Sequence, residues 1–168
     1  MKLNIEKINA KAPYKVTSIP GIHFVSFLTD FGVQYAVGFD KDDTTMPVTE
    51  TYQFSIINGN HKKSPRDPKV RETIIAIIEN FFMENQEVML YICETGDGKQ
   101  SMRNRLFEYW FNHYRKHWNI MFLTASITDE NGILNYAGIV LRNDHPRLKE
   151  IVNEFTTAVT LFNEKPVE

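Results

Sequence analysis

One stretch, residues 88–118, constrains the fold more than any other part of the chain. It begins with an apolar run over residues 88–93, continues through a glycine-bearing turn, and ends in an aromatic-rich amphipathic segment. An apolar run without alternation is typical of a strand that is covered on both faces or has neighbours on both sides. The apolar spacing after the turn predicts a helix with one buried face. We therefore expect a strand, a loop and a helix at the centre of the fold.

Patterns typical of β-strands occur in the sequence both before and after this stretch. Residues 22–29 and 33–40 form a predicted hairpin, because two strand-like segments flank a short turn and apolar and polar positions alternate in the second. A second predicted hairpin joins residues 120–128 and 133–142 at Asn131-Gly132, which supplies the positive φ of such a turn. A further strand is predicted at residues 51–57.

Two further helices are expected. Asp67-Pro68 indicates an N-cap followed by proline at the first helical position, so a helix is predicted over residues 68–83. The last helix is predicted to open at Asp144 or His145. Hairpins imply antiparallel pairing, so we predict the α+β class: a mainly antiparallel sheet of about six strands with three helices packed largely on one face, a two-layer sandwich.

The 168 residues are predicted to form a single domain, in which residues 1–13 are a loosely ordered arm. Some outward strand positions, Gly38 and Gly138 among them, are small, and such a face could be open to water, a ligand or a second copy of the chain. Cys93 is the only cysteine, which excludes an internal disulfide and suits a reducing compartment.

The expected location is the cytoplasm. The first residues lack the apolar core of a signal peptide, and no apolar run approaches the roughly 20 residues that span a bilayer. The net charge of -2 argues against a strongly basic binder of polyanions. Two basic segments, residues 62–71 and 99–116, could still bind nucleic acid. This is the weakest of the functions that we consider.

The loop that contains Glu94, Gly96, Gly98 and Lys99 is a candidate anion site, because a helix N-terminus offers free backbone N–H groups. Its glycine spacing fits neither a P-loop nor the dinucleotide fingerprint. A capping turn, with Asp97 and Gln100 in reciprocal contact, explains the same residues and is the favoured interpretation.

Arg103 is the most unusual residue of the predicted helix, because the spacing places it near the middle of the apolar face. A buried guanidinium needs a carboxylate, carbonyl groups or a bound anion. We expect an ion pair with Glu94, and less strongly an anion site that Arg71 would share. Cys93 as a nucleophile, and His113 with His117 as metal ligands, are less favoured than packing roles.

Several stretches together resemble an uncharacterised family of small bacterial proteins, known mainly from Bacteroidetes and described as a domain of unknown function. They are TDFG at residues 29–32, YQFSII at residues 52–57 and LYICETGDGKQSMRNRLFEYWF at residues 90–111. The resemblance covers about residues 22–160. It implies a bacterial, cytoplasmic protein, and it transfers no catalytic residue because the family has no established activity.

No complete catalytic, cofactor or metal motif is present in the sequence, so we predict no cofactor and no metal and favour a non-enzymatic protein. The leading hypothesis is a module for protein interaction or self-association, with a protein partner or a homo-oligomer. The alternative is binding or turnover of a small phosphate- or carboxylate-bearing ligand at the loop and helix over residues 94–105. Its contacts would be Arg103, Arg71, Lys99, Gly96, Gly98 and Glu94.

Overall fold

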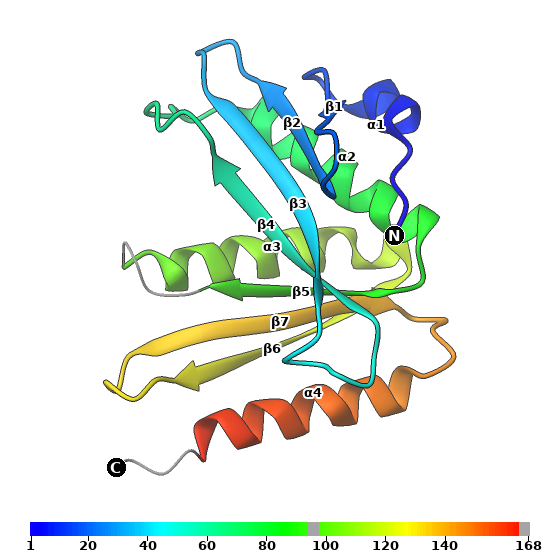
Figure 1. The fold of residues 1–168 in the computed structure, drawn as a ribbon, viewed down its shortest axis with the longest axis vertical. Helices are drawn as coiled ribbons and strands as arrows, with labels where there is room; N and C mark the ends of the chain where they lie inside the picture. The colour runs from blue at the N-terminus through cyan, green and yellow to red at the C-terminus, as the bar shows by residue number, and fades with distance from the viewer. Residues whose placement is uncertain (94–97, 165–168) are drawn as a thin grey trace. The chain divides into compact units, whose positions relative to one another are not determined.

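The computed structural model describes residues 1–93 and 98–164. In chain order, the described residues form α1 (Ile5–Lys11), β1 (Thr17–Ser18), β2 (Phe24–Leu28), β3 (Gln34–Asp42), β4 (Thr51–Asn58), α2 (Pro68–Glu84), β5 (Val88–Cys93), α3 (Gln100–Trp118), β6 (Ile120–Thr128), β7 (Leu134–Arg142) and α4 (Leu148–Asn163), as Figure 1 shows.

The α+β class and the mostly antiparallel sheet are confirmed. The strand order is β1-β2-β3-β4-β5-β7-β6, and the pair β4–β5 is parallel. The described residues contain seven strands and four helices, so the predicted counts of about six and three are wrong. The additional elements are short, and neither has the length from which a periodic pattern can be recognised.

The chain divides into two compact units. The first comprises Met1–Asp40 and Phe54–Asn85, and the second comprises Lys41–Gln53 and Gln86–Glu168. Strands β3 and β4 each pass from one unit into the other, and the single domain stays a prediction.

In the first unit, the β2–β3 hairpin packs its buried side chains against α2. Its turn is closed by the Thr29 N–H, which donates to the Val33 carbonyl at 2.9 Å. Phe81 of α2 lies stacked on Phe39, with ring centroids 4.6 Å apart, and Phe39 also contacts Phe54. The predicted helix start is confirmed, because the Asp67 carboxylate accepts a hydrogen bond from the Lys69 N–H at 3.0 Å.

Residues 1–13, for which we predicted only an arm, contain α1. Its Asn4 caps the helix by accepting from the Lys7 N–H, while the Asn4 N–H donates to Oδ1 of Asn80 at 2.8 Å. Asn85 exchanges two hydrogen bonds with the backbone of Lys2. These anchors lie far away in the sequence, which explains why local patterns did not predict the helix.

In the second unit, α3 and α4 cover opposite faces of the β5–β7–β6 sheet (Figure 1). Leu90 and Ile139 belong to one buried cluster with Phe155 of α4. Tyr91 lies on the other face and contacts Phe107 of α3, with centroids 4.8 Å apart. Adjacent residues of a strand point to opposite faces. The predicted packing of the helices largely on one face is therefore wrong in this unit.

The small strand positions Gly38 and Gly138 are buried beneath aromatic rings, so they do not form an open face. A Cβ atom on Gly138 would lie 2.2 Å from the Tyr91 ring, its direct partner on β5. A Cβ atom on Gly38 would lie 2.3 Å from the Phe24 ring, its partner on β2. Each glycine makes room for a ring that lies across it.

The last helix begins at Leu148, later than we predicted. The Asp144 carboxylate could have capped a helix, but it accepts hydrogen bonds from Nε and Nη2 of Arg142 at 2.9 and 2.8 Å. The N–H of His145 donates to the Arg142 carbonyl, which closes a turn before the helix. The N-cap residue is Arg147, which makes no side-chain capping bond.

Candidate functional site

The predicted anion loop lies only partly within the described residues. Glu94, Gly96 and Asp97 lie outside them. Gly98 has a φ of 72° and is exposed, and Lys99 is the exposed N-cap of α3 without a side-chain capping bond. Nε2 of Gln100 donates to the Leu134 carbonyl at 3.2 Å, so this amide nitrogen is directed to β7.

Arg103 is exposed, and the prediction that it lies near the middle of the buried face is wrong. The buried face of α3 is formed by Asn104, Phe107, Trp110 and Phe111, and Arg103 lies beside it. Its pairing with Glu94 stays a prediction because Glu94 lies outside the described residues.

Arg71, the second arginine of the predicted anion site, is also exposed. It belongs to the first unit, whereas Arg103 belongs to the second. An anion pocket that the two arginines share therefore stays a prediction.

Cys93 is buried and behaves as part of the core. Burial raises the pKa of its thiol to about 11, while the positive charge of Arg103 acts in the opposite direction. A thiolate is the nucleophilic form of cysteine, and a raised pKa depopulates it at neutral pH. The helix after this strand therefore does not activate Cys93, in agreement with the packing role.

We expect Cys93 to react slowly in the folded protein. With a pKa of about 11, roughly one thiol in a thousand is ionised at pH 8. Labelling with a thiol reagent at pH 8 should be about 100-fold faster in denaturant, where the pKa returns to about 8.5 and the thiol is accessible. Stopped-flow absorbance measures both rates. Equal rates in the folded and unfolded protein would contradict the buried, protonated thiol.

His113 and His117 lie on the exposed side of α3. Within residues 1–93 and 98–164, no group of three or more His, Cys, Asp or Glu side chains could hold a metal ion. A metal site with these two histidines has no third ligand there.

The exposed side of α3 carries a second apolar stripe. Met102, Leu106 and Tyr109 are 53%, 45% and 61% exposed, and His113 continues their line. Their spacing of four, three and four positions places all four on one helical face. Tyr109 and His113 are stacked, with ring centroids 6.2 Å apart. We call these four residues the α3 stripe.

Positive charge borders the α3 stripe. Arg103, Arg105, Arg115 and Lys116 are exposed on the same helix. The only acidic residue of α3, Glu108, is half-buried, and its Oε1 accepts a hydrogen bond from Oγ1 of Thr124 at 2.9 Å. The exposed charged residues of α3 are therefore all cations, and they accompany exposed apolar side chains on the same helix.

A second candidate site is a hollow in the same unit, between the β3–β4 connection and α4. It has a volume of about 400 Å3, and its walls include Val48, Leu161 and Phe162. A neighbouring hollow of about 380 Å3 reaches the strands at Ile92 and Ile127. Thr45 and Phe162 line both, so the two hollows adjoin. We call them together the α4 hollow.

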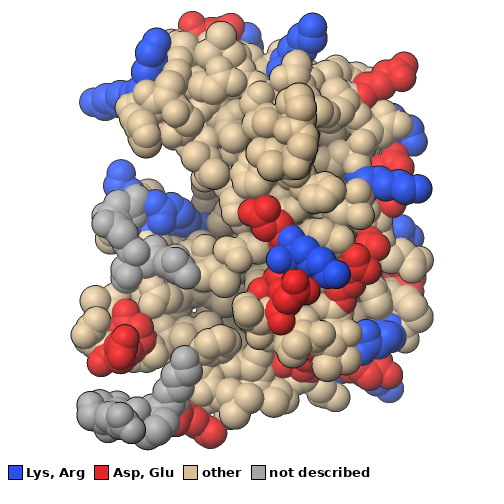
Figure 2. All heavy atoms as spheres, viewed as in Figure 1, with Lys and Arg blue, Asp and Glu red and all other residues tan. Residues whose placement is uncertain are grey.

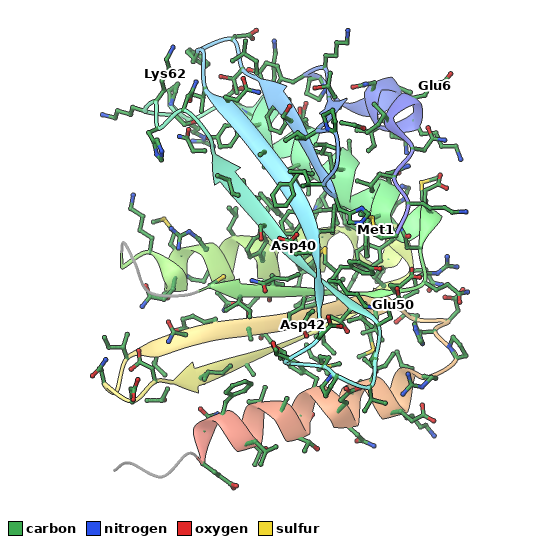
Figure 3. The ribbon with its side chains drawn as sticks, viewed as in Figure 1. Met1, Glu6, Asp40, Asp42, Glu50 and Lys62 are labelled. Carbon is green, nitrogen blue, oxygen red and sulfur yellow. The ribbon has the colours of Figure 1, made fainter. Side chains whose placement is uncertain are left out.

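Local hydrogen bonds shape the loop wall of the α4 hollow. The buried Asp42 carboxylate accepts from the N–H groups of Thr45 and Met46, at 3.2 and 2.9 Å to Oδ2. Figure 3 labels Asp42 and Glu50 near the two ends of this connection. An aspartate that bonds the backbone ahead of it fixes a turn. The connection is therefore an ordered wall.

The loop is tied to α4 through Glu154. Its Oε1 accepts from the Val48 N–H at 2.9 Å, and its Oε2 accepts from Oγ1 of Thr49. The two bonds fix the carboxylate at the wall of the hollow. No sequence pattern predicted this site, because Thr49 and Glu154 are 105 positions apart and carry no shared motif. The one local signal was Asp42, which precedes a turn.

The described residues thus define an α+β protein with a mostly antiparallel sheet of seven strands. None of its described helices has the length and apolarity needed to cross a membrane. A family model described as a family of unknown function (DUF6169) matches residues 66–157, which is more than half of the chain, and the protein belongs to this family. No curated protein matches the chain.

Proposed function

We propose that the protein is a non-enzymatic interaction module that binds an acidic helix of a partner protein along α3. The observation that carries the proposal is the α3 stripe, which exposes Leu106 and Tyr109 between cations. Methionine, tyrosine and arginine are enriched at protein interfaces, and a few buried aromatic residues commonly dominate the binding free energy. A partner helix with an apolar stripe can pack against α3 as one helix packs against another.

Charge favours a different protein over a second copy as the partner. If two α3 helices packed stripe against stripe, Arg105 and Lys116 would meet cations of the other copy, because α3 offers no exposed carboxylate. Like charges beside a helical seam destabilise the pair, whereas opposite charges select a partner. A partner with Glu or Asp beside its apolar stripe satisfies both requirements.

A nucleic acid is a less suitable partner for the protein. The net charge is -2, and Figure 2 shows a face on which basic and acidic side chains are intermixed over a mostly uncharged surface. Binding along a phosphate backbone requires cations in a continuous stripe or groove. The apolar centre of the α3 stripe instead suits a protein helix.

The buried, unpaired Cys93 fits the cytoplasmic setting that we propose.

Two synthetic helical peptides test this function. One carries a leucine stripe flanked by glutamates, and the other carries the same stripe flanked by lysines. We expect the glutamate peptide to bind about tenfold more tightly or better, because its charges complement those of α3. Replacing both Leu106 and Tyr109 by alanine should weaken its binding by about tenfold or more. Fluorescence anisotropy measures each dissociation constant.

Met83→Ala is the matched control, because Met83 is an exposed apolar residue of α2 outside the α3 stripe. Equal affinity for the two peptides, or an unchanged affinity in the double variant, would refute the proposed interface. Sedimentation of the free protein provides a further check. A dimer that the double variant converts to monomer would show that a second copy is the partner.

A further inference from the structure

The α4 hollow has the size and the lining that are common in binding sites for small ligands. Pockets for small ligands commonly have volumes of about 300–1,000 Å3 and mostly apolar walls with a few fixed polar groups. The larger part of the hollow has about 400 Å3, and Val48, Leu161 and Phe162 supply apolar wall. The adjoining part adds about 380 Å3 and extends the apolar wall to Ile92 and Ile127. Together the two parts have room for an elongated apolar chain.

The Glu154 carboxylate supplies a charged group to the wall and is held in place by hydrogen bonds. Its two oxygens accept from the Val48 N–H and from Thr49, both uncharged donors. Nη1 of Arg147 donates to Oγ1 of Thr49 at 3.5 Å, so this guanidinium bonds the threonine beside the carboxylate. Among the described residues, no lysine or arginine forms an ion pair with Glu154.

We propose that the α4 hollow binds a hydrophobic amine, with its ammonium group at Glu154 and its hydrocarbon chain against Leu161, Phe162 and Ile127. An ammonium group supplies N–H donors and a positive charge to a carboxylate that still has lone pairs available. The hydrocarbon chain of the ligand covers apolar side chains of the wall and shields them from water. This favours binding in proportion to the apolar area covered. The site is independent of the α3 stripe, since the two share no residue.

The charge of the wall selects among ligands with the same chain. A carboxylate head group would repel Glu154, and an alcohol would donate one hydrogen bond to it without carrying a positive charge. An ammonium group adds the attraction between opposite charges to its hydrogen bonds with the carboxylate, which an uncharged donor cannot do. The expected order of affinity is therefore amine, then alcohol, then carboxylate.

Octylammonium chloride, octanol and sodium octanoate test the proposal by isothermal titration calorimetry on the full chain. We expect octylammonium to bind with one-to-one stoichiometry and about tenfold more tightly than octanoate. In Glu154→Gln, the preference for the amine over the alcohol should disappear. In Ala158→Trp, all binding should be lost, because Ala158 lines the hollow and the indole fills it.

Glu150→Gln is the matched control, because Glu150 is an exposed carboxylate of α4 outside the lining, and this variant should retain the wild-type order of affinity. Circular dichroism checks the fold of each variant. If Glu154→Gln does not fold, the proposal is tested by two other results. These are the order of affinity of the three ligands for the wild type and the loss of binding in Ala158→Trp. Octanoate binding as tightly as octylammonium, or binding unchanged in Ala158→Trp, would overturn the proposal.

Discussion

Replacing Gly138 by alanine is expected to lower the free energy of unfolding by about 3 kcal/mol. The added Cβ atom would lie 2.2 Å from the Tyr91 ring, so one of the two groups must move. Tyr91 is only 1% exposed, and Phe107 and Phe111 contact its ring, so it has no space to move into. The strain must therefore spread to the strands or to α3. Chemical denaturation followed by circular dichroism measures the loss.

Two other glycines provide the comparison. Gly59→Ala should change the free energy of unfolding little, because the nearest atom would lie 3.5 Å away and the backbone has no positive φ. Gly38→Ala should cost less than Gly138→Ala, because the Phe24 ring is only half-buried and can swing into solvent. Equal losses at positions 38 and 138 would show that ring confinement is not the cause.

Replacing Phe81 by alanine is expected to lower the free energy of unfolding by about 3–5 kcal/mol. The side chain is fully buried in the first unit, where it stacks on Phe39 and meets the edge of Phe82. Alanine removes both contacts and leaves a cavity that α2 and the hairpin must line. Aromatic pairs of this kind contribute beyond the area that they bury. Urea titration followed by tryptophan fluorescence and by circular dichroism measures the change.

Met83→Ala on the same helix is the control, because Met83 is 57% exposed and its truncation creates no cavity. It should change the free energy of unfolding by less than about 0.5 kcal/mol. A loss at Phe81 no larger than the loss at Met83 would mean that α2 does not pack through the Phe39–Phe81 stack.

Local patterns were sufficient for the longer elements. The uninterrupted apolar run predicted β5 with both of its ends at Val88 and Cys93, and the Asp67-Pro68 pair predicted the start of α2. Each signal lies within a few residues of the structure that it specifies. Helix α1 has no such signal, because it has one buried residue, Ile8, and depends on Asn80 and Asn85. An isolated helix of that length is not stable in water.

The candidate site was predicted less well than the fold. Helix α3 has apolar residues on two sides, and periodicity alone cannot decide which side meets the sheet. The sequence grouped Leu106 and Arg103 with Phe107 and Phe111, but the first two are exposed and the last two are buried. The α4 hollow requires the β3–β4 connection to meet a helix about 100 positions later, which no local pattern encodes.

The last turn of α4 also affects how the sheet ends. Strand β6 is the outermost strand of the second unit. The Asn163 side chain forms hydrogen bonds with two backbone groups of β6. Its Oδ1 accepts from the Thr128 N–H at 3.0 Å, and its Nδ2 donates to the Ser126 carbonyl at 3.2 Å. This amide takes the place of a neighbouring strand. Exposed sheet edges are templates for aggregation. By bonding these groups, Asn163 hinders another chain from pairing with this end of β6.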